Sequence, residues 1–139
     1  MNVVCPEVKI RAEARSTSVE NLDKQVGHMI QRFEEAAREW GAEVKIDHER
    51  HYDSYNIASD SLVVKVAQEA AREMGFDGNL RTTLGGSDAN VYNAKGVPTI
   101  VVATGMDKIH THDEFISRKD LVDTAELAYR LIRKAADIA

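Results

Sequence analysis

Apolar and charged side chains alternate near the start of the chain and then recur at helical spacing. Residues 8–16, "VKIRAEARS", alternate strictly, which predicts a strand with one buried and one wet face. Apolar residues then return every three or four positions over residues 19–40, and Gly41 follows, as is typical of a long amphipathic helix. Residues 43–52, "EVKIDHERHY", predict a second strand. The pattern indicates a β-α-β unit, whose helical crossover favours parallel strands.

The polar, turn-rich stretch "DSYNIASD" separates this unit from a second pattern, so we expect domains at 1–53 and 54–139. The second pattern alternates helices and strands: helix 61–74, strand 80–84, a short helix ending at Gly96, strand 97–104, a loop at 105–116 and a helix that Ser117 caps. Strand 97–104, "VPTIVVAT", is continuously apolar, as in parallel sheets buried on both faces. The predicted fold class is α/β, with loops at the strand ends where ligands bind.

The composition of the chain limits the binding partners and the cellular compartment that we expect for it. The chain has 139 residues and a formal net charge of -5, which argues against nucleic acid as a partner. It contains neither an apolar run long enough for a membrane span nor a signal peptide at its start. The single cysteine, Cys5, excludes an internal disulfide and fits a reducing compartment, so we expect a cytoplasmic protein; its apolar neighbours predict a buried strand entry.

The stretch "GGSDAN" combines a glycine turn with good helix-capping residues. Two glycines ahead of a helix let backbone N–H groups approach an anion, and Ser87 and Asp88 favour a helix start. Arg81, just upstream, is a cation that could hold a substrate carboxylate through two hydrogen bonds. The alternatives are an ordinary capped glycine turn and a surface arginine.

The segment "IHTHDE", residues 109–114, concentrates potential metal ligands in a predicted loop. His110 and His112 would share one face of a strand, whereas the spacing of His110 and Glu114 favours a ligand supported by a carboxylate. Glu114 could equally serve as a charge near the start of the last helix. A zinc ion needs three or four protein ligands, and the remaining sequence offers few.

The run "GGSDANVYNAKGVPTIVVATGMDKIHTHDE" resembles the C-terminal part of the co-catalytic zinc metallopeptidases, in their peptidase T-like (aminotripeptidase) branch. The upstream "VKIRAEARSTS" is similar to the second half of that family's ferredoxin-like lid, or dimerisation, domain. The resemblance implies a β-α-β half of the lid at 1–53 and an α-β-α-β-α portion of the catalytic domain at 54–139.

The resemblance also implies an exopeptidase that hydrolyses peptide or amide bonds with two zinc ions. Carried over by position, His110 is the last metal ligand and Glu114 its support. The residues expected to bind the peptide substrate lie in and before the glycine turn: Arg81, Gly86, Ser87 and Asn90.

The rest of the family's catalytic machinery has no match in these residues. The His-x-Asp motif, the bridging aspartate and the Glu-Glu pair with the general base are absent, so we expect no catalytic residue, no stably bound zinc and an inactive isolated chain. The alternative function is an oligomerisation or binding module. In that case the unfinished sheet edge beside Val8 and Ile10 would pair with a second copy.

Overall fold

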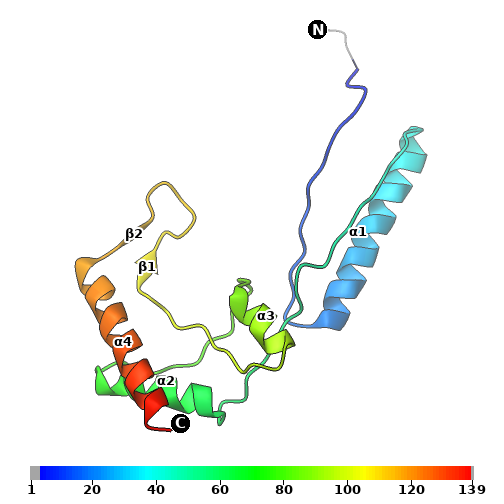
Figure 1. Cartoon of the computed structure of the whole chain (residues 1–139). Helices are drawn as coiled ribbons and strands as arrows, with labels where there is room; N and C mark the ends of the chain where they lie inside the picture. The colour runs from blue at the N-terminus through cyan, green and yellow to red at the C-terminus, as the bar shows by residue number, and fades with distance from the viewer. Residues whose placement is uncertain (1–3, 139) are drawn as a thin grey trace. The chain divides into compact units, whose positions relative to one another are not determined.

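The computed structural model of the protein describes residues 4–138, which fall into two compact units, 4–54 and 55–138. The first unit holds helix α1, and the second holds helices α2, α3 and α4 and a two-stranded sheet, β1 and β2 (Figure 1). The architecture is therefore a mixture of helices with a small antiparallel sheet. Within residues 4–138, every helix is too short or too polar to traverse a lipid bilayer.

Helix α1, Val19–Trp40, confirms the helix predicted for the first unit. It begins where the Ser18 side chain accepts a hydrogen bond from the Asn21 N–H at 3.3 Å. It ends at Gly41, whose φ of 64° lies in the left-handed region that glycine adopts at low cost. Ala42 N–H then returns to the Ala37 carbonyl at 2.8 Å and closes the helix end.

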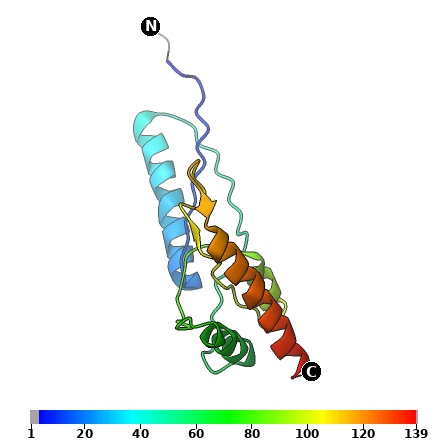
Figure 2. The ribbon, with the colours of Figure 1, turned by 90° about the vertical axis from the view of Figure 1, so that its left-hand side faces the viewer.

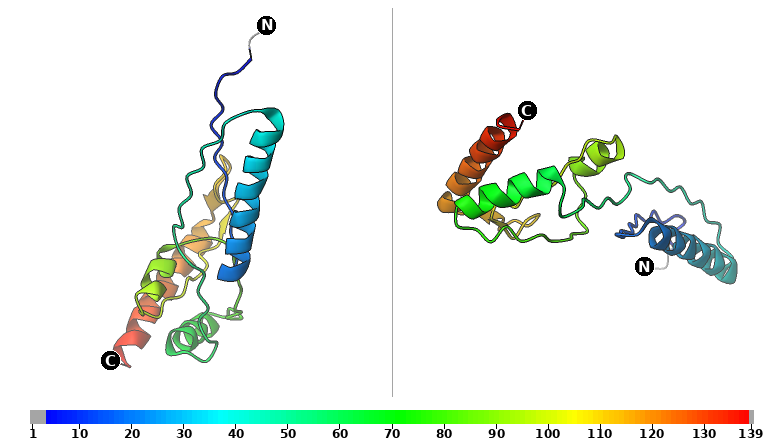
Figure 3. Two further views of the ribbon diagram at one scale, coloured as in Figure 1. Left: turned by 90° about the vertical axis from the view of Figure 1, so that its right-hand side faces the viewer. Right: turned by 90° about the horizontal axis from the view of Figure 1, so that it is seen from below.

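The predicted strands on either side of α1 are extended but pair with no other segment in the described part of the chain. Residues 8–16 and 43–52 run back along α1 (Figures 1 and 3), and Arg50 on the second segment pairs with Asp23 of the helix. A strand exists only when a neighbouring backbone pairs with it, and no described segment supplies one here. The prediction of a paired β-α-β unit was wrong for this reason.

The side chains of the first segment are correspondingly exposed. Val8 and Ile10 are 71% and 64% exposed, so the predicted buried face is uncovered. Cys5 is also exposed, with its Sγ 3.0 Å from the Glu7 carbonyl oxygen, which corrects the expectation of a buried strand entry.

The second unit confirms its predicted helices to within about a turn. They are α2 (Leu62–Glu73), α3 (Asp88–Ala94) and α4 (Arg118–Ala136). Helix α4 begins as predicted at Ser117, whose side chain accepts a hydrogen bond from the Asp120 N–H at 3.0 Å. Helices α2 and α4 pack against each other at an inclined angle (Figures 1 and 3).

The strands of the second unit differ from those expected. Residues 80–84 and 97–104 are extended but unpaired in the described part of the chain. The predicted loop at 105–116 instead contains the sheet: β1 (Met106–Asp107) pairs antiparallel with β2 (Phe115–Ile116). Apolar periodicity does not reveal so short a hairpin, because its register is set by the turn between the strands.

The core is small for the length of the chain. In residues 4–138, the buried apolar residues are Val64, Ala70 and Ala89, all in the second unit. The fold therefore leaves uncovered much of the apolar surface that the sequence pattern assigns to a core.

Candidate functional site

The tip of the β1–β2 loop presents His110 in a constrained backbone conformation. The loop extends beyond the start of α4 (Figures 1 and 2), and its described side chains are exposed. Lys108 and His110 have φ angles of 48° and 67°, which are unfavourable for residues with a Cβ. The Thr111 hydroxyl donates to the Lys108 carbonyl at 2.7 Å, and the Asp113 N–H donates to that hydroxyl at 3.2 Å. These bonds keep the turn closed.

Glu114 holds His110 through the backbone. Its Oε2 accepts a hydrogen bond from the His110 N–H at 2.6 Å, a short contact for a charged acceptor. The two residues proposed as ligand and support are therefore in contact, but the carboxylate meets the peptide N–H. The His110 imidazole makes no hydrogen bond within residues 4–138, so it is left available. The metal-binding role of both residues stays a prediction.

The base of the loop is fixed to α4 by a close backbone approach. A Cβ added to Gly105 would lie 2.7 Å from the Cβ of Asp120, and Gly105 has a φ of 77°. Next to it, the Thr124 hydroxyl donates to the Thr104 carbonyl at 3.1 Å. Only glycine fits this position without displacing the helix. The contacts of Thr104 and Gly105 with α4 therefore fix the start of the loop that carries His110.

The glycine turn at "GGSDAN" is organised around the start of α3. Ser87 accepts a hydrogen bond from the Ala89 N–H at 3.3 Å, and the Asn90 side chain accepts one from the Ser87 N–H at 3.0 Å. This is a reciprocal capping arrangement, and Asn90 is only 8% exposed. Ser87 and Asn90 therefore lie together, with Gly86 exposed beside them. The bonds serve the helix start, and a substrate role for these residues stays a prediction.

Arg81 is exposed and has no hydrogen bond or ion pair to any residue in the described part of the chain. The structure brings His110 together with Glu114, and Ser87 together with Asn90. Neither His110 nor Glu114 has a hydrogen bond or ion pair to Arg81 within residues 4–138.

The described residues do not by themselves fit a metal centre. Within residues 4–138 there is no group of three or more His, Cys, Asp or Glu side chains arranged to hold a metal ion. A catalytic zinc takes three protein ligands. His110 can therefore be one donor at most, and any further donors must come from outside the residues described.

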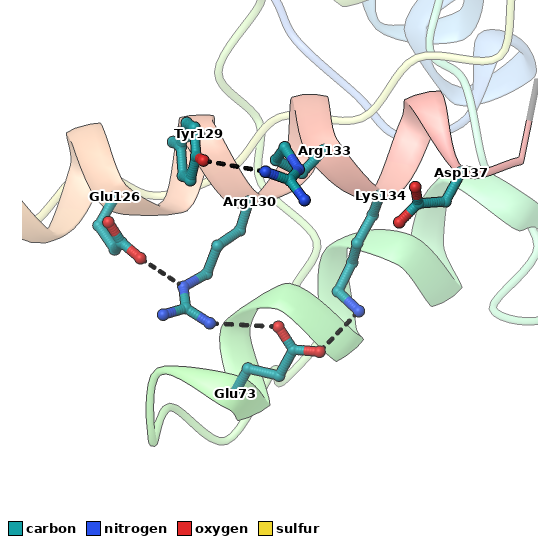
Figure 4. Close-up of a pocket in the computed structure, with 7 residues that line it drawn as sticks. All are labelled: Glu73, Glu126, Tyr129, Arg130, Arg133, Lys134 and Asp137. Atoms are coloured by element: carbon teal, nitrogen blue, oxygen red, sulfur yellow. Dashed lines mark hydrogen bonds and ion pairs between the residues drawn. The ribbon is translucent and has the colours of Figure 1, made fainter.

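A second polar cluster lies where α4 packs on α2 (Figure 4). A hollow of about 370 Å³ is lined by these residues: Glu73, Glu126, Tyr129, Arg130, Arg133, Lys134 and Asp137. Glu73 on α2 is 2.7 Å from the Lys134 ammonium and 3.2 Å from the Arg130 guanidinium, both on α4. These pairs clamp one helix to the other.

The ion pairs between α2 and α4 shift the pKa values of Glu73 and Lys134 in the directions expected for opposite charges. The hydrogen bond from Lys134 lowers the pKa of Glu73 below 4.5, and the charge of Lys134 and the contact with Arg130 act in the same sense. The hydrogen bond to Glu73 in turn raises the pKa of Lys134 above 10.5. The cluster balances its own charges, so we assign it to helix packing and not to catalysis.

Asn93, a residue that sequence reasoning missed, shapes the approach to strand segment 97–104. Its Nδ2 donates to the Thr99 carbonyl at 2.7 Å and to the Ala89 carbonyl at 2.8 Å. Its Oδ1 accepts from the Thr99 N–H at 3.0 Å. The only signal in the sequence was an asparagine in the last turn of a helix, where its side chain competes for backbone groups.

The sequence of residues 4–134 matches the Peptidase family M20/M25/M40. The chain is 41% identical over 135 residues to "Uncharacterized protein YqjE" of Bacillus subtilis, a match covering 97% of this chain and 36% of that protein. It is also 33% identical over 76 residues to Peptidase T of Shouchella clausii, covering 55% of this chain and 18% of that protein.

Solved structures of peptidases are also similar to this chain. A tripeptidase from Staphylococcus aureus superposes with a TM-score of 0.79 at 34% identity, covering 88% of this chain and 33% of that chain. The aminopeptidase PepT from Bacillus cereus superposes with a TM-score of 0.69 at 36% identity, covering 86% and 32%. The chain thus spans about a third of the length of these proteins.

Proposed function

Because the chain belongs to the peptidase family M20/M25/M40, we propose that it forms the C-terminal part of a metal-dependent exopeptidase resembling tripeptide aminopeptidases. On this proposal residues 1–53 are the second half of a lid domain and residues 54–139 the end of a catalytic domain. The substrate is a short peptide, whose amide bond is hydrolysed by the complete enzyme.

The observation that carries the proposal is the backbone conformation of His110 and the hydrogen bond that fixes it. His110 has an unfavourable backbone conformation, and its N–H is bonded to Glu114 at 2.6 Å. Its imidazole makes no hydrogen bond within residues 4–138, so the ring is available to a ligand. Strain of this kind persists where the surrounding structure enforces it, and it clusters at functional sites. His110 supplies one metal donor, since members of this family generally use metal ions. We propose zinc as the ion.

Arg81 and the glycine turn supply substrate contacts on this proposal. The exposed guanidinium of Arg81 is free to form a two-point contact with a peptide carboxylate. Gly86 leaves its backbone accessible beside the start of α3, while Ser87 and Asn90 hold that start in shape. Their contribution would be to bind and orient the peptide, with no proton transfer assigned to them.

Two assays test the proposal. A chimera of the Bacillus subtilis relative, with this chain replacing its matching third, should hydrolyse di- and tripeptides in the presence of zinc, manganese or cobalt. His110→Ala should abolish that activity, whereas His112→Ala should leave most of it. A chimera whose activity survives His110→Ala would overturn the assigned role.

The isolated chain should be inactive under the same conditions, because the described residues hold no complete metal centre. Turnover by the purified chain that is lost on His110→Ala would contradict this part of the proposal.

A second candidate function is an oligomerisation module. The exposure of Val8 and Ile10 on an unpaired segment supports it, because such edges pair with other chains. Sedimentation of the purified chain over a range of concentrations tests it. Self-association that is lost in the double variant Val8→Lys, Ile10→Lys is the expected result, and a monomer at all concentrations would exclude it.

A further inference from the structure

The Asn93 side chain on α3 bonds the backbone at two places, which lie on either side of it in the sequence. Its Oδ1 accepts a hydrogen bond from the Thr99 N–H at 3.0 Å, and its Nδ2 donates to the Thr99 carbonyl at 2.7 Å. The same Nδ2 donates to the Ala89 carbonyl at 2.8 Å. One side chain therefore ties the first turn of α3 to the extended segment that follows the helix.

The hydrogen bonds continue from Ala89 to the glycine turn. The Ala89 N–H donates to the Ser87 hydroxyl at 3.3 Å, and the Ser87 N–H donates to the Asn90 side-chain oxygen at 3.0 Å. Ala89 and Asn90 are only 4% and 8% exposed, so water competes little for these groups. A continuous chain of hydrogen bonds thus runs from Thr99 through Asn93 to Ser87.

This chain of bonds ends at the peptide group that joins Gly86 to Ser87. The Ser87 N–H and the Gly86 carbonyl belong to one planar group, so the bond to Asn90 also fixes the direction of that carbonyl. The N–H and C=O groups of Gly86 itself make no hydrogen bond within residues 4–138, and the residue is exposed. They are the groups that the turn leaves open to a peptide.

We propose that Asn93 is a positioning residue for peptide binding. Through Ala89 and Ser87 it holds the backbone of Gly86 in place. The inference rests on the proposed function, because the glycine turn is a substrate contact only within it. Both polar atoms of the Asn93 side chain are already bonded, so the residue does not touch the peptide. Its effect falls on the affinity for peptide and not on the chemical step, since the turn takes no part in proton transfer.

Asn93→Leu tests the proposal in the purified chain through amide hydrogen exchange. The change keeps the bulk of the side chain and cuts its bonds in both directions, so exchange should accelerate roughly threefold to tenfold at Ser87 as well as at Thr99. Tyr92→Leu, at an exposed position of the same helix, is the matched control and should leave both amides unchanged. Acceleration confined to Thr99 means that Asn93 serves only the segment beside it, and overturns the proposal.

Asn93→Asp decides the question where circular dichroism shows that the leucine variant fails to fold. The carboxylate keeps an acceptor for the Thr99 N–H but has no N–H to donate to the Ala89 carbonyl. Exchange should therefore accelerate more at Ser87 than at Thr99. Equal acceleration at the two amides, or the opposite order, overturns the proposal.

The same variants in the Bacillus subtilis chimera separate binding from chemistry. With a tripeptide as substrate, Asn93→Leu should raise KM roughly threefold to tenfold and change kcat by less than about twofold. An unchanged KM overturns the proposal, whatever the value of kcat. A chimera with Asn93 intact that hydrolyses no peptide overturns the proposed function instead, and exchange at Ser87 then decides alone whether Asn93 holds the turn.

Discussion

The carboxylate of Glu114 accepts a hydrogen bond from the backbone N–H of His110 at 2.6 Å. The two residues are four apart in sequence and occupy the tip and the return of the β1–β2 loop. The contact fixes the peptide before His110, and through it the direction in which the imidazole leaves the backbone. Glu114 thus acts on the position of the imidazole without touching it.

Glu114→Ala should release this peptide. We expect amide exchange at His110 to accelerate roughly fivefold to tenfold, as for the loss of about 1 kcal/mol from a hydrogen bond to a charged group at an exposed site. Glu114→Gln retains an uncharged acceptor and should give a smaller change. Measurement is by NMR-detected hydrogen exchange, with Asp113→Ala as the control from the same loop. Equal rates at His110 in all the variants would contradict the contact.

Gly105→Ala should loosen the base of the loop. The added Cβ would meet Asp120 at 2.7 Å and the backbone would keep a φ of 77°, so we expect a cost of about 2–3 kcal/mol in unfolding free energy. Gly75→Ala is the matched control, since Gly75 has a φ of 82° but nothing within 4 Å of its Cβ position. That change should cost only about 1 kcal/mol. Urea denaturation distinguishes the two, and equal costs would remove steric contact as the cause.

Asn93→Leu should detach α3 from the segment that follows it. The change preserves side-chain bulk but leaves both backbone groups of Thr99 without their partner, at a cost of about 1–3 kcal/mol. Asn79→Leu is the control, because among the described residues the Asn79 side chain bonds only the exposed Asp77. Faster amide exchange at Thr99 in the first variant alone is the expected result, and an unchanged Thr99 would refute the role of Asn93.

The packing of α2 on α4 should weaken in acid. The pKa of Glu73 is lowered in the folded state, so its ion pairs contribute stability above pH 4.5 and lose it as the pH falls through the folded-state pKa. Lys134→Met should flatten this part of the pH profile of thermal stability. Lys24→Met, which removes a pair confined to α1, should not. A wild-type slope that persists in Lys134→Met would assign the acid sensitivity to other groups.

The helices were predictable from the sequence because their signals are local. Ser117 and Gly41 mark a start and a stop through bonds to the helix they border, and apolar spacing supplies the rest. The strands were not, because residues 8–16 and 97–104 carry the right pattern but require a partner strand that no described segment provides. A pattern predicts which segments are suited to pairing, whereas pairing depends on a second backbone.

The candidate site was predictable in part. The spacing of His110 and Glu114 indicated a contact, and the structure contains one. It runs through a backbone N–H, a distinction that spacing cannot make. The positive φ of His110 and the close approach of Gly105 to Asp120 have no signature in the sequence beyond the glycine itself. Asn93 escaped notice because its partner, Thr99, lies beyond the end of its own helix.

The backbone N–H and C=O groups of residues 100–103 form no hydrogen bond in the described part of the chain. This also affects how the chain behaves at high concentration. The stretch from Thr99 to Thr104 has no charge and is rich in β-branched residues. Its unbonded backbone groups lie between its two bonded ends, Thr99 and Thr104. Short segments of this composition stack into fibrils when identical segments from different molecules associate. Pro98, which has no N–H to donate, stands directly before it and limits growth of the ladder on that side. Expression yield and solubility should therefore depend on how soon this stretch is covered after synthesis.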